Sequence, residues 1–155
     1  MKLTPEESRI VERMGSGVLS RAGMLGTDGR QLPEILDTDR ATVEALGVTH
    51  ERIAARLDAI YRQAELAQGA PVEVAEGLQA SHVDARGRIP CPWPGCGGFE
   101  KGEVALTDAR TGWQAFLTPL SIHMIAAHGF YQGRGARYRL EPGELVRRLA
   151  LTPEA

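Results

Sequence analysis

The segment 91–128 opens with CPWPGC (91–96) and closes with LSIHMIAAH (120–128). These two short stretches contain both cysteines of the chain and two of its four histidines. Four residues separate the two cysteines, and four residues separate the two histidines. Two thiolates followed by two imidazoles are the ligand types of a tetrahedral zinc site. We therefore predict one Zn²⁺ ion, bound by these four side chains: Cys91, Cys96, His123 and His128.

The residues around the predicted ligands favour a tight loop followed by a helix. Two prolines and a glycine stand between the cysteines, and these residue types set turns that bring both thiolates to one side. Thr118 with Pro119 is a good helix start, and Gly129 is a good stop. Five residues turn an ideal helix by about 500°, so the imidazoles would point about 140° apart. We expect a widened or tightened last turn to bring both nitrogens onto one metal.

This arrangement resembles the two-Cys two-His zinc-finger family, whose second half reads Leu, two residues, His, three to five residues, His. Leu120, His123 and His128 fit that pattern, and Phe99 resembles the aromatic residue that follows the second cysteine. The likeness is confined to residues 91–128. It implies a ββα unit that is held together by zinc.

The distance between the cysteine pair and the histidine pair departs from the family pattern. Twenty-six residues (97–122) separate the two pairs, where the family usually has about twelve. We interpret the excess as a longer hairpin, with strands at Gly102–Thr107 and Trp113–Leu117 around a turn at DARTG (108–112).

Two other interpretations of the cysteines stay open, namely unligated buried thiols and a disulfide. Metal binding is favoured because both cysteines fall in one turn and the next helix carries the two histidines. His82 stands nine residues before Cys91 and is a candidate to orient a ligand from outside the metal shell. A lone histidine on a strand is more often an ordinary core or surface residue.

The composition is that of a globular protein. Of the 155 residues, 43% are hydrophobic and 25% are charged. No apolar run approaches the roughly twenty residues that cross a bilayer, and MKLTPEESRI (1–10) lacks the apolar region of a signal peptide. We therefore expect a cytoplasmic protein without a membrane partner, in a compartment where thiols stay reduced.

The N-terminal half is predicted to be helical. Thr4 and Glu7 form a capping box for the first helix. A short helix or turn at 32–37 precedes helices at about 40–46 and 50–68. The last two resemble a helix-turn-helix, but residues 1–80 carry nine Lys and Arg against thirteen Asp and Glu, an acidic balance that disfavours contact with phosphates. An amphipathic helical hairpin is the better interpretation.

We predict an α+β fold, with a helical N-terminal region (1–69) and a smaller C-terminal α+β region (70–155) that contains the zinc-finger-like unit. The two regions are either distinct or one continuous domain. Short strands are expected at about 72–74 and 78–83, and a last helix at about 142–149.

A glycine-punctuated loop rich in arginine and aromatic residues follows the second histidine. Such a loop can bind nucleic acid through base stacking and phosphate contacts, or it can simply pack by its aromatic residues with solvated arginines. If it binds nucleic acid, the expected phosphate contacts are these side chains: Arg134, Arg137 and Arg139.

The sequence favours a non-enzymatic, zinc-binding module, regulatory in role, with nucleic acid as its partner. The first alternative is a structural zinc site in a protein-interaction domain. The second is a small metal-dependent hydrolase, in which one histidine would leave a position open on the metal. Residues 124–127, between the histidines, include no glutamate, so the general base of H-E-x-x-H hydrolases is missing. The sequence sets neither the partner nor the oligomeric state.

Overall fold

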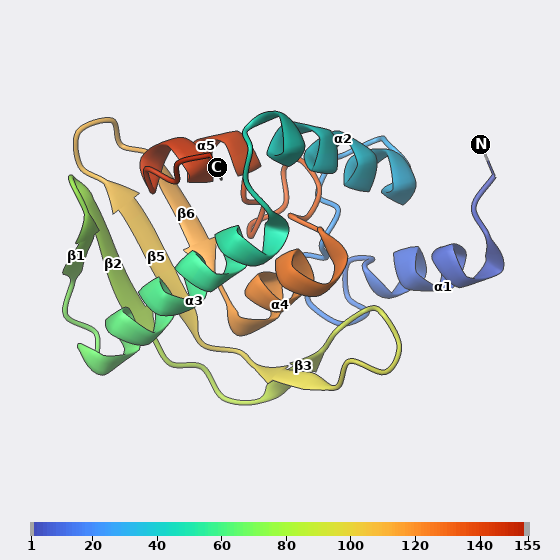
Figure 1. The fold of residues 1–155 in the computed structure, drawn as a ribbon. Coiled ribbons are helices and arrows are strands. Elements are labelled where there is room, and N and C mark those ends of the chain that lie inside the picture. Colours follow the sequence, from blue (N-terminus) through green and yellow to red (C-terminus); the bar gives the residue numbers. More distant parts are fainter. Residues whose placement is uncertain (1, 154–155) are drawn as a thin grey trace.

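The structure is a computed structural model that describes residues 2–153 of the chain (Figure 1). Its helices and strands occur in this order: α1 (Pro5–Arg13), α2 (Leu32–Ala45), α3 (His50–Leu66), β1 (Val72–Ala75), β2 (Leu78–Val83), β3 (Arg88–Pro90), β4 (Gly98–Glu100), β5 (Glu103–Asp108), β6 (Gln114–Leu117), α4 (Pro119–His128) and α5 (Pro142–Arg148). The predicted α+β class is confirmed. Among the helices of residues 2–153, none has the length and apolar character that a bilayer span requires.

The larger sheet has four antiparallel strands in the order β1, β2, β5, β6. Helix α3 packs on this sheet and on α4 (Figure 1). On β5, Val104 and Leu106 are fully buried, because alternate residues of a strand point to the same face. Helix α3 buries Ile53, Leu57 and Ile60, one stripe of its surface. Helix α2 instead packs on α5, so α2 and α3 do not lie along each other as the helical-hairpin interpretation predicted.

We call the buried cluster around α3 and this sheet the sheet core. It consists of Val43, Val48, Ile53, Ala54, Leu57, Ile60, Tyr61, Ala64, Leu78, Ala80, Val104, Leu106, Ala115, Leu117, Ile122, Ile125, Tyr131, Leu140, Leu145, Val146 and Leu149. Its members come from both sides of the predicted boundary at residues 69 and 70. A division of the chain into two regions stays a prediction.

A second buried cluster, the knuckle core, lies where α1, α2, α4 and the cysteine loop meet. It consists of Ile10, Met14, Met24, Leu32, Ile35, Cys91, Leu120, Met124 and Phe130. Helix α1 begins at the predicted capping box, in which Thr4 Oγ1 accepts from Glu7 N–H and Glu7 Oε1 accepts from Thr4 N–H. The box fixes the start of the helix that brings Ile10 into this cluster.

Helix α2 is one continuous element, whereas the sequence indicated a short helix or turn followed by a second helix. The interruption was expected because Thr38 and Asp39 are typical helix caps. Instead, the Asp39 carboxylate accepts two hydrogen bonds from Arg139, at 2.6 and 3.0 Å. Because its carboxylate is paired with Arg139, Asp39 does not cap the backbone, and α2 continues through this residue.

The arrangement of the hairpins also differs from the expectation. The predicted hairpin is present as β5 and β6, but β5 also pairs with β2, so the hairpin belongs to the four-stranded sheet. The cysteine loop is flanked instead by a separate two-stranded ladder of β3 with β4. The finger-like ββα unit is therefore β3, β4 and α4, with β5 and β6 inserted before its helix.

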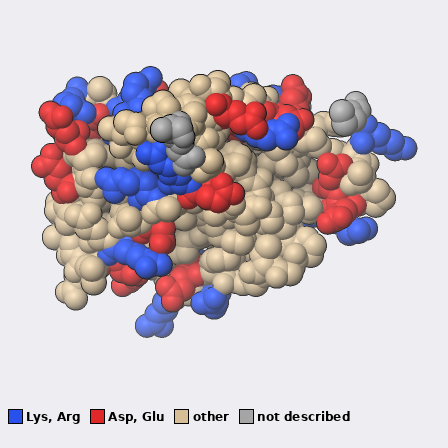
Figure 2. Space-filling view, in the orientation of Figure 1, with Lys and Arg blue, Asp and Glu red and all other residues tan. Residues whose placement is uncertain are grey.

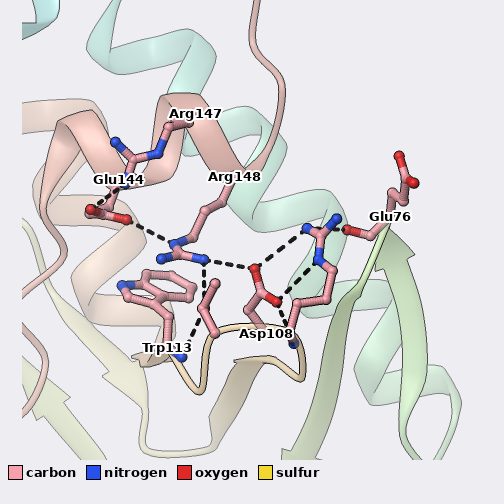
Figure 3. Close-up of polar contacts among 8 residues, drawn as sticks. Glu76, Asp108, Trp113, Glu144, Arg147 and Arg148 are labelled. Atoms are coloured by element: carbon pink, nitrogen blue, oxygen red, sulfur yellow. Dashed lines mark hydrogen bonds and ion pairs between the residues drawn. The ribbon is translucent and has the colours of Figure 1, made fainter.

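Helix α5 is fastened to the turn between β5 and β6 by a polar network (Figure 3). The Asp108 side chain, 3% exposed, accepts from Arg148 at 2.7 Å and from the backbone N–H of Arg110 at 2.9 Å. The Arg148 guanidinium also lies 4.6 Å from the centre of the Trp113 ring and 2.8 Å from Glu144. These contacts leave the buried carboxylate paired and hold α5 against the sheet.

Candidate metal centre

The structure brings the four predicted ligands together as a possible metal-binding group. The Sγ atoms of Cys91 and Cys96 and one ring nitrogen from each of His123 and His128 all lie within 4.8 Å of one another. The Nε2 atom of His128 is 3.6 Å from the Cys91 sulfur and 3.4 Å from the Cys96 sulfur. Zinc–sulfur and zinc–nitrogen bonds of about 2.3 and 2.0 Å at tetrahedral angles place sulfur and nitrogen about 3.6 Å apart. The observed separations therefore suit a tetrahedral ion.

The cysteine loop, residues 91–97, is a closed turn that we call the knuckle. Its ends are joined by a hydrogen bond from the Cys91 N–H to the Gly97 carbonyl, at 3.1 Å. Gly95 and Gly97 have φ values of 85° and 78°, a left-handed conformation that side chains beyond glycine seldom adopt. The Arg13 guanidinium at the end of α1 donates to the Cys91 carbonyl at 3.0 Å. These contacts direct both sulfurs toward α4.

Helix α4 supplies both histidines and begins where the sequence indicated. Thr118 Oγ1 accepts from the Ser121 N–H at 3.0 Å, and Ser121 Oγ accepts from the Thr118 N–H at 2.9 Å. At the other end, Gly129 has a φ of 62°, and the Phe130 N–H reaches back to the Met124 carbonyl at 3.1 Å. That bond belongs to a left-handed cap that follows His128, and the two imidazole centroids are 5.4 Å apart. The expected widening or tightening of the last turn stays a prediction.

Aromatic rings enclose the two imidazoles. Trp93 stacks on His128 with centroids 4.1 Å apart and planes 8° from parallel. Phe99 stacks on His123 at 4.5 Å, and Phe130 meets the edge of Trp93 at 5.5 Å. Stacked rings fix the orientation of the imidazoles and keep water from them. The sequence indicated Phe99 but not Trp93, although the place of Trp93 between two prolines of the knuckle was a usable signal.

Burial sets the protonation of the ligands before metal binds. It lowers the pKa of His123 and, together with the neighbouring His123, that of His128. Both rings are therefore neutral at pH 7, the form that binds metal. Burial raises the pKa of Cys91 to about 11. Metal must displace the thiol proton, so binding releases protons and is favoured by higher pH.

His123 provides a second test of whether a metal fits. Its Nε2 atom is buried and has no hydrogen-bond partner among residues 2–153. A buried nitrogen without a partner loses its hydration without compensation, which costs about 1–3 kcal/mol. A metal ion on this nitrogen removes that cost. The donor set, two sulfurs and two imidazoles, is the set typical of structural zinc.

His82, which the sequence suggested could orient a metal ligand, is outside the metal group. It lies on β2 with Nε2 3.2 Å from the Tyr61 hydroxyl. The carboxylates of Asp84 and Glu65 lie 3.8 and 3.9 Å from the same nitrogen. Its contacts are thus with α3 and the end of β2.

The three arginines predicted to contact phosphates have different surroundings. Arg139 is 9% exposed and forms an ion pair with Asp39 at 2.6 Å. Burial alone would lower the pKa of Arg139, but the hydrogen bonds to Asp39 and Glu141 raise it. Arg137 pairs with Glu103 at 2.9 Å and lies over the Phe116 ring. Arg134 is exposed.

The charges on the surface are mixed. On the face shown in Figure 2, basic side chains lie next to acidic ones. Intramolecular carboxylates already neutralise two of the three arginines, at 2.6 and 2.9 Å. The nucleic-acid role of this loop stays a prediction, and Arg134 is its strongest remaining candidate.

The likeness to two-Cys two-His zinc fingers holds for the ligand types and their order. The helix that carries the histidines and the ladder beside the cysteines also correspond, while the inserted hairpin has no counterpart in the family pattern. No protein-family model matches this chain, and no curated protein or solved structure matches it either.

Proposed function

We propose that this chain binds one Zn²⁺ ion through Cys91, Cys96, His123 and His128, and that the ion is structural. The observation that carries the proposal is the convergence of four sulfur and nitrogen ligands within 4.8 Å. Thiolate and imidazole ligands in equal number select zinc over the hard cations magnesium and calcium, which prefer oxygen.

A structural role is favoured over a catalytic one because four protein ligands leave no position on the metal for water or substrate. The rings of Trp93 and Phe99 cover the imidazoles and restrict access further. Glu103, a nearby carboxylate in the sequence, is held by Arg137 and Tyr138 at 2.9 and 3.2 Å. It is therefore not free to act as a general base toward a metal-bound water.

The ion would join the knuckle to α4, two segments that already meet in the knuckle core. The knuckle rests on α1 through Arg13, and the histidines belong to α4, which packs against α3 in the sheet core. Zinc would therefore reinforce the packing of the knuckle, and of α1 through Arg13, on the body of the protein. We infer that the chain is a zinc-stabilised, non-enzymatic binding module.

The test is metal analysis of the purified chain, followed by replacement of the metal with Co²⁺. We expect about one zinc per chain and, with cobalt, the intense visible absorption of a tetrahedral thiolate site. Cys96→Ser and His123→Gln should each weaken metal binding by at least about tenfold. His82→Gln is the matched control, because it alters a buried histidine outside the metal group, and it should leave the cobalt spectrum unchanged.

Three results would overturn the proposal. The first is a chain without bound metal after purification in reducing, chelator-free buffer. The second is a cobalt spectrum typical of six-coordination. The third is that His82→Gln and His123→Gln weaken metal binding equally. Zinc content that falls only in the ligand variants, with an unchanged fold in the control, would support it.

A further inference from the structure

Trp93 connects the two halves of the proposed metal centre. It belongs to the knuckle, which carries both sulfurs, and its ring lies on His128, which α4 supplies. The two rings are within 8° of parallel, with centroids 4.1 Å apart. Phe130, a residue of the knuckle core that is 1% exposed, meets the indole at 62° with centroids 5.5 Å apart. This buried ring supports the indole in its position on His128.

The stack on His128 differs from the one on His123. Phe99 lies over His123 with centroids 4.5 Å apart, but the two planes differ by 29°. Phe99 belongs to β4, whereas Trp93 stands between the two cysteines. A movement that takes the sulfurs away from α4 therefore also takes the indole away from His128.

His128 is the imidazole that faces both sulfurs. Its Nε2 atom is 3.6 Å from the Cys91 sulfur and 3.4 Å from the Cys96 sulfur. A chelator removes a metal by replacing its ligands, and an imidazole leaves a metal by turning its nitrogen away. A ring that lies flat against the imidazole opposes this turn, because the two faces must separate first. The Trp93 ring therefore restrains the release of His128 from a metal.

A bound metal should also strengthen the stack. A Zn²⁺ ion on Nε2 draws electron density out of the His128 ring and makes that ring more positive. The face of an indole is negative, and among aromatic side chains it attracts positive groups most strongly. Coupling of this kind is reciprocal, so the stack strengthens metal binding by the same factor by which the metal strengthens the stack.

We propose that Trp93 is a gating residue of the metal centre, whose stack on His128 limits the rate of zinc release. Release then requires the knuckle to move away from α4 while the sheet core stays folded. This rests on the proposed function, because it needs zinc on the four ligands. The knuckle is closed by its own hydrogen bond from Cys91 to Gly97, and Pro94 and Gly95 are exposed, so it can move as a unit.

The experiment measures how fast the zinc-loaded full chain gives up its metal to an excess of 4-(2-pyridylazo)resorcinol, a chelator that changes colour when it binds zinc. Trp93→Leu keeps an apolar side chain without a ring, and Trp93→Phe keeps a ring. Release should be about tenfold faster in the leucine variant and within about threefold of the unmodified rate in the phenylalanine variant. A role in packing alone would give the two variants the same rate.

Trp113 is the other tryptophan of the chain and provides the matched control. Its ring lies under the Arg148 guanidinium, beside α5, and Trp113→Phe should leave the release rate unchanged. In that variant Trp93 is the only source of indole fluorescence. Addition of chelator should change the Trp93 emission at the same rate as zinc is released, because the indole then separates from His128. This measurement leaves Trp93 in place and does not depend on how its variants fold.

Leu106→Ala distinguishes movement of the knuckle from unfolding of the whole chain. Leu106 is fully buried in the sheet core, so its truncation destabilises that core. Release by local opening does not pass through unfolding of the sheet core, and the rate should therefore stay within about twofold of the unmodified rate.

Three results would overturn the gating role alone, in chains that carry one zinc each. The first is equal release from the unmodified chain and Trp93→Leu, or equal acceleration in the leucine and phenylalanine variants. The second is a Trp93 emission that does not respond to chelation. The third is an acceleration in Leu106→Ala as large as that in Trp93→Leu. Metal analysis before mixing separates these results from failure of the proposed function, in which the unmodified chain contains no zinc.

Discussion

The sheet core and the knuckle core differ in what holds them together. Twenty-one buried residues form the sheet core and nine form the knuckle core, and one of the nine, Cys91, is a proposed metal ligand. A fully buried aliphatic or aromatic side chain contributes about 1.5–3 kcal/mol, so the first cluster is stabilised mainly by apolar burial. The strands β3 and β4 beside the knuckle have three residues each, and such a two-stranded ladder is barely stable alone.

The comparison shows that one chain can stabilise adjoining regions by different means. Apolar burial is enough where four strands and a helix face one another. Where a short loop meets the end of a helix, the proposed metal ion would add stability that a small buried cluster does not provide. The two regions should therefore respond differently to the same perturbation.

Loss of a metal ligand should have the largest effect. Cys96→Ser, or chelation of the unmodified chain, should increase hydrogen exchange at the knuckle and α4, while β2 and β5 stay protected. Structural zinc contributes about 10–16 kcal/mol in isolated zinc peptides, which is an upper limit for the effect expected here. Hydrogen exchange measured residue by residue checks this, with His82→Gln as control. Equal loss of protection in both cores would show that they do not differ as described.

Truncation of a side chain in the sheet core should have the opposite effect, destabilising that core and leaving the metal site unchanged. Leu106 is fully buried, so Leu106→Ala should lower the free energy of unfolding by about 4 kcal/mol through lost burial and the cavity left behind. Below the melting temperature, the cobalt spectrum of the metal site should not change. Denaturant unfolding and the cobalt spectrum of one sample check both parts. A changed spectrum would mean that the metal geometry depends on this core.

The buried ion pair between Arg139 and Asp39 should give the next largest effect. Arg139→Ala leaves the Asp39 carboxylate, 5% exposed, without its partner, and should lower the free energy of unfolding by about 3 kcal/mol. The matched variant is Arg134→Ala, an exposed arginine of the same loop, for which a change within about 0.5 kcal/mol is expected. If the two variants melt alike, the pair contributes nothing to stability.

Acid should destabilise the loop that contains Asp28 and packs on the C-terminal segment. Hydrogen bonds from Arg30 hold the pKa of Asp28 well below its usual value of 3.8. A carboxyl whose pKa is lowered by folding stabilises the fold above its unfolded pKa, and this contribution is lost as pH falls below about 4. In Asp28→Asn the melting temperature should therefore fall less steeply between pH 4 and pH 2 than in the unmodified chain. An equal fall of the melting temperature with pH in the two chains would contradict this.

The smallest effect concerns the predicted contact with nucleic acid. If the exposed Arg134 binds phosphate, Arg134→Ala should reduce the slope of log affinity against log salt by about one and leave the melt unchanged. Gel retardation of DNA and RNA probes across a salt series measures this slope. No retardation of any probe by the unmodified chain at low salt would end the nucleic-acid hypothesis.

Local signals in the sequence predicted the helix ends and the ligands. The capping residues Thr4 and Thr118, and the left-handed stop at Gly129, act within a few residues of their own positions. The same is true of the ligand spacing, since each pair lies within a stretch of six residues. These features could be predicted because the energy that sets them is local.

The features that were missed depend on distant partners. No pattern in β5 indicates that it pairs with β2 as well as with β6. Arg139 looks like an exposed cation in the sequence, and only the fold brings Asp39 to it across an interval of 100 residues. The continuity of α2 follows from the same contact. Long-range pairings of this kind are invisible to reasoning by period and spacing.

The insertion of β5 and β6 between the two ligand pairs has a consequence for the order of folding. In an unfolded chain, closing a loop of 26 residues (97–122) costs about 0.7 kcal/mol more than closing the family's usual twelve. Once Val104 pairs with Leu117, most of that loop is already closed. Zinc should then capture its last ligands after the hairpin has formed. We therefore expect strand pairing to set the rate of refolding, and the ion to bind late in folding rather than to nucleate it.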